Sequence, residues 1–225
     1  MNTHSFFGRI SRPPRFRRAA VLLVALAWTS LAPGGEIQVA ARDGNLAKVA
    51  TLLKANPDLA ASKDKDGMTP LEWATFAGHK DVVELLLTNK ADVNVRDNMG
   101  STPLHAAAVT GRKDLAEVLL ANKAEVNARD KDLHTPLHYA AANDHKNVAE
   151  LLLANKADIN AKDKDGLTPL HWAAFKDNKD VAELLLANKA DINAKDSLGL
   201  TPLHRATVMG YKDVAELIRQ HGGQE

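Results

Sequence analysis

Hydrophobic and polar positions recur along this chain with a fixed spacing of 33 residues. The tripeptide Thr-Pro-Leu marks each step, beginning at Thr69, Thr102, Thr135, Thr168 and Thr201. An alanine-rich stretch, a polar break and a leucine-rich run follow each copy, and a degenerate copy without the tripeptide occupies residues 40–64. A short fixed period indicates supersecondary units that stack and contact only their neighbours.

The first part of each unit predicts a short helix that begins at the proline. In the unit that starts with Thr168, the threonine hydroxyl can cap free backbone N–H groups, and Pro169 suits the first helical position. Leu170, Ala173 and Ala174 then fall at i, i+3 and i+4, which gives one apolar face. We expect this helix to end after about two turns, at a position that favours left-handed backbone. Glycine holds that position in four units and aspartate in two: Gly44, Gly78, Gly111, Asp144, Asp177 and Gly210.

The leucine-rich run predicts a second helix that is buried on most sides. In Val181-Ala-Glu-Leu-Leu-Leu186 only Glu183 is polar, so neighbouring units must cover this helix. An Asp or Asn followed three residues later by Glu resembles a capping box at its start. These pairs are Asp81 and Glu84, Asp114 and Glu117, Asn147 and Glu150, Asp180 and Glu183, and Asp213 and Glu216. An extended segment with an Asp-Gly turn signal follows and predicts a projecting hairpin.

The two ends of the repeat array differ from its middle. Lys48 stands where the central units have an apolar residue such as Val181, and Arg219 stands where they have Leu186. We therefore expect polar capping units, with Lys48 and Arg219 at the two extremities of the stack.

Together these motifs closely resemble the ankyrin repeat over residues 36–223. The shared features are TPLH at the helix start, the alanine pair, the Gly turn, the leucine run and the ADINAKD-type segment. The resemblance implies an all-α ankyrin-repeat solenoid of stacked helix-turn-helix units with projecting β-hairpin loops, which binds other proteins through its concave face. Lysine replaces the family's usual glycine at Lys90, Lys123, Lys156 and Lys189, at a cost of roughly 1 kcal/mol each if the backbone there is left-handed. Leu133 replaces a hairpin glycine, so that hairpin is expected to deform.

On this reading the chain has two parts. Residues 1–35 form a signal peptide or signal anchor, and residues 36–225 form the repeat domain. The expected units are 36–66, 67–99, 100–132, 133–165, 166–198 and 199–225.

The N-terminal segment has the composition of an export signal. Its five charged residues before Pro33 are all arginines, and an apolar run of 14 residues follows at 19–32. Fourteen residues are too few for a membrane span, which needs about 20, but they suit the hydrophobic core of a secretory signal peptide. We therefore predict a periplasmic or secreted protein. An uncleaved membrane anchor and a twin-arginine signal at Arg17 and Arg18 are the alternatives.

Composition narrows the possible partners and chemistry. The chain has no cysteine, which excludes disulfides and thiolate metal sites. Beyond the N-terminal arginines, 24 Lys and Arg face 28 Asp and Glu, a net charge of −4. Nucleic-acid binding needs a basic stripe, so this balance argues against a nucleic-acid partner.

Candidate catalytic and metal-binding residues do not converge. His105, His138, His171 and His204 recur once per unit, about 10 Å apart in stacked helices, whereas zinc ligands sit at about 2.1 Å. We expect them to bond backbone atoms or the neighbouring unit. The Glu residues also occur once per unit, which supplies no acid and base pair. We therefore predict no cofactor, no metal and no enzymatic activity, with an unrecognised hydrolase as the least favoured alternative.

The remaining candidate function is protein binding by a monomeric scaffold or inhibitor whose partner the sequence does not name. Aromatic, Met and Leu side chains beside Lys and Asp are typical of protein interfaces. Trp73, Tyr139 and Trp172 are expected to pack between units, with partner contact as the alternative. The predicted contact residues are Lys65, Met68, Phe76, Asn98, Met99, Ser101, Val109, Lys131, His134, Asn143, Lys164, Leu167, Phe175, Lys176, Leu198, Leu200 and Met209.

Overall fold

The computed structural model describes residues 35–225. The predicted signal segment therefore lies outside the described residues, apart from Gly35. Between residues 35 and 225 no helix is both long enough and apolar enough to cross a membrane.

The described residues form twelve α-helices and one short 3-10 helix, η1, with no β-strand among them. The helices follow one another in pairs, each a short helix, a tight turn and a second helix. Their bounds are α3 Glu36–Arg42, α4 Leu46–Ala55, η1 Pro57–Ala61, α5 Pro70–Ala77, α6 Lys80–Thr88, α7 Pro103–Thr110, α8 Lys113–Ala121, α9 Pro136–Ala142, α10 Lys146–Ala154, α11 Pro169–Lys176, α12 Lys179–Ala187, α13 Pro202–Met209 and α14 Lys212–Gln220.

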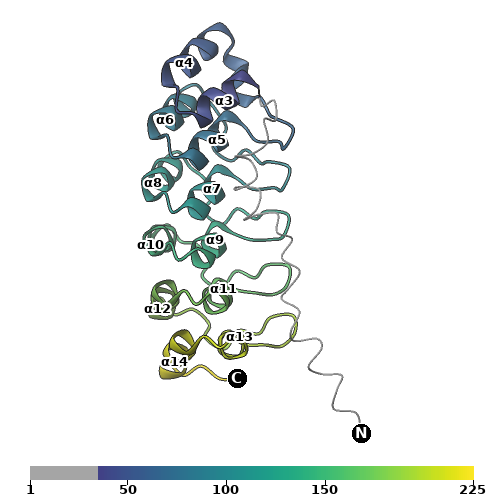
Figure 1. Cartoon of the computed structure of the whole chain (residues 1–225), viewed down its shortest axis with the longest axis vertical. Coiled ribbons are helices and arrows are strands. Elements are labelled where there is room, and N and C mark those ends of the chain that lie inside the picture. Colours follow the sequence, from purple (N-terminus) through teal and green to yellow (C-terminus); the bar gives the residue numbers. More distant parts are fainter. Residues whose placement is uncertain (1–34) are drawn as a thin grey trace. The chain divides into compact units, whose positions relative to one another are not determined.

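The pairs stack into two parallel rows of helices (Figure 1). An inner row of α3, α5, α7, α9, α11 and α13 lies between the hairpin loops and an outer row of α4, α6, α8, α10, α12 and α14. Each helix contacts its own pair partner and the equivalent helix of the adjacent pairs. This arrangement confirms the predicted all-helical solenoid.

The inner helices begin and end where the sequence predicts. Thr168 is the N-cap of α11, and its hydroxyl accepts a hydrogen bond from the His171 N–H. Pro169 is the first helical residue. Asp177 ends the helix with φ 60°, and Asp144 has φ 56°, so both aspartates adopt the left-handed backbone that glycine adopts elsewhere.

The start of the outer helices differs from the prediction. They begin one residue earlier, as α6 does at Lys80, and the N-cap residue His79 makes no side-chain cap hydrogen bond. Asp81 is therefore inside the helix, where its carboxylate accepts the Val82 N–H. The expected Asp-to-Glu capping boxes do not form because a capping side chain must precede the first helical residue.

The core lies between adjacent helix pairs, as the apolar run predicts. Val181, Ala182 and Leu185 of α12 are each 0% exposed, whereas Leu184 is half-buried against the same core. Both predicted end markers are exposed. Lys48 forms a 2.8 Å ion pair with Glu36, and its side chain is 46% exposed.

The segments between pairs form tight loops that are linked tip to tip. Asn98 donates its backbone N–H to Asp66 O, and Lys131 donates to Met99 O, each at 2.9–3.0 Å. Leu133 has φ 63°, so this loop keeps the left-handed backbone with a leucine in place of glycine. The hairpins are therefore ordered by turns and by their neighbours rather than by strands.

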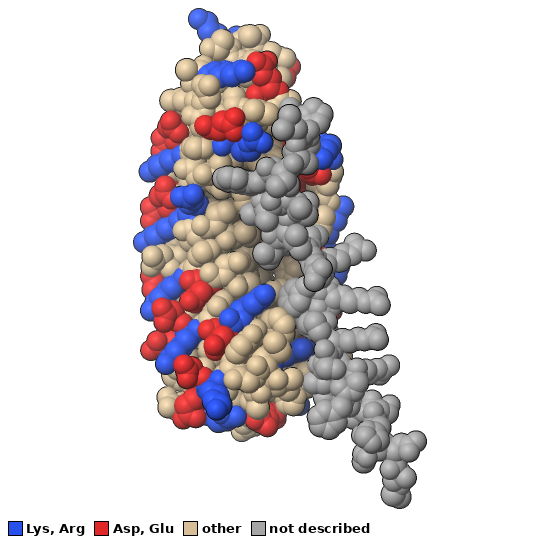
Figure 2. Space-filling view, in the orientation of Figure 1, with Lys and Arg blue, Asp and Glu red and all other residues tan. Residues whose placement is uncertain are grey.

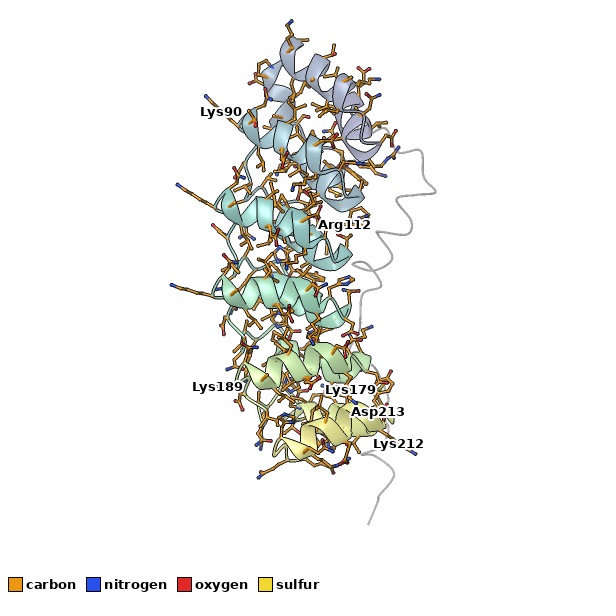
Figure 3. The ribbon with its side chains drawn as sticks, turned by 90° about the vertical axis from the view of Figure 1, so that its left-hand side faces the viewer. Lys90, Arg112, Lys179, Lys189, Lys212 and Asp213 are labelled. Atoms are coloured by element: carbon orange, nitrogen blue, oxygen red, sulfur yellow. The ribbon has the colours of Figure 1, made fainter. Side chains whose placement is uncertain are left out.

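Four lysines follow the ends of outer helices in left-handed backbone. The φ angles of Lys90, Lys123, Lys156 and Lys189 lie between 64° and 70°. Lys90 and Lys189 project from one edge of the stack, opposite the edge where Lys179 and Lys212 begin their helices (Figure 3). A cation just beyond a helix C-terminus interacts favourably with the helix dipole, which offsets part of the backbone cost.

Candidate functional site

The candidate functional site is the side of the stack that carries the inner helices and the hairpin tips. Trp73, Phe76 and Ala77 of α5 are partly exposed, as are the residues at the same positions of the four later pairs, so that they form three rows along the stack. We call the surface made by these three rows and the hairpin tips the recognition surface.

Most of the predicted contact residues are at least partly accessible. The exposed ones are Lys65, Asn98, Lys131, Lys164, Lys176, Leu198 and Met209. The half-buried ones are Met68, Phe76, Met99, Ser101, Val109, His134, Asn143, Phe175 and Leu200. Accessibility is necessary for contact, and it leaves their role in binding a prediction.

Leu167 is different, because the structure places it in the interior. It is only 5% exposed. Its N–H donates to Asp163 Oδ1 at 2.8 Å, and its carbonyl lies 3.1 Å from His138 Nε2. The hairpin folds this position under its own turn, so Leu167 is a packing residue rather than a contact residue.

The three large aromatic residues of the first row are held by the hairpins. Trp73 donates its indole N–H to Asp64, Tyr139 donates its hydroxyl to Asp130, and Trp172 donates its indole N–H to Asp163. These bonds measure 2.7–2.9 Å. All three side chains are half-buried, so each packs against its own hairpin and keeps an accessible part. Each aspartate precedes its aromatic partner by nine residues.

Three of the four recurring histidines join consecutive units, whereas the buried Nε2 of His204 has no hydrogen-bond partner among the described residues. The Thr102 N–H donates to His105 Nδ1 at 3.0 Å, which leaves the proton on Nε2 for donation to the His134 carbonyl at 3.2 Å. Burial lowers the pKa of His105 to about 4, so this imidazole is neutral at pH 7. His138 and His171 make the same pair of contacts. The structure thus confirms a bonding role for these three residues.

His134 lies at the junction of two hairpins. Its Nδ1 is 3.2 Å from Asp130 Oδ2, and its Nε2 is 3.5 Å from Asp163 Oδ2. Burial opposes a charged imidazole, but the two carboxylates outweigh burial and raise the pKa of His134 to about 9. His134 is therefore a cation that bridges two units at neutral pH.

Two accessible apolar residues of the recognition surface, Val208 and the hairpin residue Leu133, were not predicted from the sequence. Val208 is 49% exposed and lies one period after Phe175. The predicted contact residues Leu198 and Met209 are also exposed, at 69% and 43%. The repeat period could have identified Val208, because it lies 33 residues after the predicted contact residue Phe175.

Charges of both signs alternate along the outer helices (Figure 2). Lys113 and Glu117 of α8 lie 3.8 Å apart, and Lys80 and Glu84 of α6 lie 3.9 Å apart. Such exposed pairs contribute little to stability. In Figure 2 the area beside the charged outer helices, toward the middle of the view, is largely uncharged.

Candidate metal ligands are dispersed over the part of the chain that the structure describes. Between residues 35 and 225, no three His, Asp or Glu side chains are placed to hold a metal ion. The histidine and aspartate contacts described above instead join loops, helices and successive pairs.

A stack of helix pairs with linked hairpins on one side defines a repeat protein of the interaction-module class. The comparison with known families agrees. The profile described as "Ankyrin repeats (3 copies)" matches residues 37–130, 94–163 and 137–225. The chain therefore belongs to the ankyrin-repeat family.

Curated proteins with similar sequence match over short stretches. The chain is 44% identical over 64 residues to the E3 ubiquitin-protein ligase XBAT33 of Arabidopsis thaliana. It is 43% identical over 65 residues to the probable E3 ubiquitin-protein ligase XBOS33 of Oryza sativa subsp. japonica. Each match covers 28% of this chain and 12% of the relative. The chain thus aligns with a small part of each relative.

Proposed function

We propose that this chain is a non-enzymatic scaffold or inhibitor that binds one protein partner through the recognition surface. The ankyrin repeats support protein binding as the general activity. We further propose that the protein is exported and acts as a monomer. An N-terminal apolar segment with preceding arginines supports export.

The observation that carries the proposal is the exposure of three large apolar residues in the last hairpin and the last inner helix, α13. Leu198, Val208 and Met209 are between 43% and 69% exposed. Large apolar side chains that stay in water are typical of surfaces that bind a partner. The equivalent positions vary in part, since those of Leu198 are Asp66, Met99, Asp132 and Asp165, whereas α10 and α12 repeat nearly the same sequence throughout.

The relatives' names do not transfer to this chain. The proteins XBAT33 and XBOS33 are named as ubiquitin ligases, but the matched stretch covers 12% of each. What the chain shares with them over that stretch supports a common type of binding module and no ligase activity.

The binding proposal is tested by capture with the full chain as bait. A triple variant, Leu198→Ala, Val208→Ala and Met209→Ala, should reduce recovery of a specific partner at least tenfold in quantitative mass spectrometry. The matched control replaces Lys113, Glu117 and Lys146 on outer helices with alanine and should retain the partner. Equal loss from both variants would place the interface elsewhere.

The export proposal needs a separate measurement. Cell fractionation with N-terminal sequencing should find the mature chain outside the cytoplasm and without Met1. An intact N-terminus in the membrane fraction would favour the alternative of an anchored scaffold.

A further inference from the structure

Five hairpin aspartates share one hydrogen-bonding pattern. One carboxylate oxygen of each accepts backbone N–H groups of its own loop, as Asp97 Oδ1 does from Met99 at 2.7 Å and Ser101 at 2.9 Å. In four loops the other oxygen accepts a hydrogen bond from the side chain of the residue nine positions further along the chain. The four pairs are Asp64 with Trp73, Asp130 with Tyr139, Asp163 with Trp172 and Asp196 with Arg205.

Asp97 lacks the second half of this pattern. The residue nine positions on is Ala106, whose methyl group cannot donate a hydrogen bond. Among residues 35–225, the hydrogen bonds to the carboxylate of Asp97 come from backbone N–H groups of its own loop, among them those of Met99 and Ser101 to Oδ1. Asp97 is half-buried, whereas the paired Asp130 and Asp196 are 8% and 7% exposed.

The environment of Asp97 leaves its negative charge poorly compensated. Burial raises the pKa of the Asp97 carboxyl above its ordinary value. For Asp130 burial acts in the same direction, but His134 and Tyr139 outweigh it and lower the pKa to about 2. His134 contributes more to this lowering than Tyr139 does, and Asp97 has neither partner, because Ser101 and Ala106 occupy the equivalent positions.

The last hairpin shows which group fits this position. Arg205 Nε donates to Asp196 Oδ2 at 2.8 Å, and Arg205 Nη2 makes a second contact with the same oxygen. Arg205 occupies the position in α13 that Ala106 occupies in α7. The loop geometry therefore accommodates a guanidinium group beside the aspartate.

The neighbours of Ala106 favour the same kind of group. Its equivalents in the adjacent helices α5 and α9 are Trp73 and Tyr139, and both helices pack against α7. Aromatic rings attract cations placed over their faces, and the planar guanidinium of arginine stacks on them. The alanine thus leaves the row without a large side chain at this position, next to a carboxylate that no side chain contacts by a hydrogen bond. We call this position, which lies between Trp73 and Tyr139 along the row, the gap.

We propose that the gap at Ala106 is a subsite for an arginine side chain of the protein partner, which Asp97 binds in the way that Asp196 binds Arg205. This inference rests on the proposed function, since it specifies the chemistry of one contact on the recognition surface. Arginine suits the subsite better than lysine because its fork donates more than one hydrogen bond to a carboxylate.

The subsite is tested without the partner by a titration of the full chain with N-acetyl-arginine methylamide. The side-chain carboxyl ¹³C resonance of Asp97 should shift and saturate. The citrulline analogue, in which a neutral urea replaces the guanidinium, should cause a shift at least five times smaller at the same concentration. Asp196 is the internal control and should stay unchanged, because Arg205 already occupies it.

Two variants exchange the properties of the two loops. Ala106→Arg should fill the gap from within, lower the pKa of Asp97 and remove its response to the probe. Arg205→Ala should open the equivalent gap, so that Asp196 begins to respond.

Three results would overturn the subsite. They are a silent Asp97 in the unaltered chain, equal responses of Asp97 and Asp196, and a response of Asp97 that persists in Ala106→Arg. Each leaves the proposed function intact, because partner capture is measured separately with Leu198, Val208 and Met209. Equal loss of the partner from the triple variant and from its outer-helix control would instead contradict the proposed function, whatever the response of Asp97 is.

Discussion

The outer helices and the recognition surface of this stack follow opposite sequence rules. The sequences of α10 and α12 are nearly identical, KNVAELLLA and KDVAELLLA. The first row of the recognition surface reads Trp73, Ala106, Tyr139, Trp172 and Arg205. A position packed between two copies of itself is restricted in volume and polarity. A position with one free side can vary, so packing restricts the two sides of the same units to different degrees.

The largest effect should come from a cavity between the outer helices. Leu185 is 0% exposed, and Leu185→Ala should cost about 2–5 kcal/mol of unfolding free energy. Leu184 is its half-buried neighbour, and Leu184→Ala should lower the unfolding free energy by less than Leu185→Ala does. Denaturant unfolding of both variants measures the difference. Equal costs would contradict the burial pattern, and with it the contrast between the two sides.

The bridge at His134 should make stability depend on pH. Its pKa in the folded protein, about 9, lies above the ordinary histidine pKa of 6.5. The stabilisation is therefore fully present below pH 6.5 and is lost as the pH rises through 9, with a magnitude on the order of 2 kcal/mol. Burial also raises the pKa of Glu72, to about 8, so part of the decline with pH has another origin.

The variant His134→Leu isolates the contribution of the bridge. Leucine occurs at the equivalent position 167, so it is compatible with the loop. Chemical unfolding at pH 6 and pH 9.5 should show a smaller decline for the variant than for the unaltered chain. Parallel pH profiles would show that the bridge does not join the two units.

Much of this architecture can be predicted from the sequence because its causes are local. Thr168-Pro169 fixes a helix start through one cap and one constrained φ angle. Asp144 and Asp177 were identifiable as left-handed residues because they fill a glycine position. The caps at Lys48 and Arg219 followed from comparing units at the same period.

The remaining features depend on how distant parts of a unit meet. Leu167 is apolar and lies next to a turn, so only the folded loop shows that it points inward. The Asp-to-aromatic pairs join a hairpin to a helix nine residues later, a spacing that belongs to no regular element. The predicted capping boxes of the outer helices were wrong, because the helix start lies one residue earlier than expected and Asp81 is inside the helix.

A smaller effect is expected at the lysines that follow the outer helices. Lys123 has φ 70°, and Lys123→Gly should relieve about 1 kcal/mol of backbone strain. The lost interaction with the helix dipole should offset up to about 0.5 kcal/mol of that gain at low salt. The variant should therefore gain stability, and gain more at high salt. Thermal unfolding at two salt concentrations measures both the relief of backbone strain and the lost helix-dipole interaction. A loss of stability in the variant would contradict backbone strain at Lys123.

The smallest effect on stability belongs to the recognition surface. Leu198→Ala and Val208→Ala should each change the unfolding free energy by less than about 0.5 kcal/mol, because both side chains are largely in water. The melting temperature measures this directly. An early-melting variant would show that the side chain is part of the core and does not belong to a contact surface.

The most direct test of the account exchanges an end of the stack with its middle. Val148 of α10 is 0% exposed, and its counterpart in the first pair is the exposed Lys48. Val148→Lys should cost more than about 3 kcal/mol, because it buries an unpaired charge between helix pairs. Lys48→Val should change stability by less than about 0.5 kcal/mol. Unfolding curves that show similar costs for the two substitutions would contradict a core formed between neighbouring pairs.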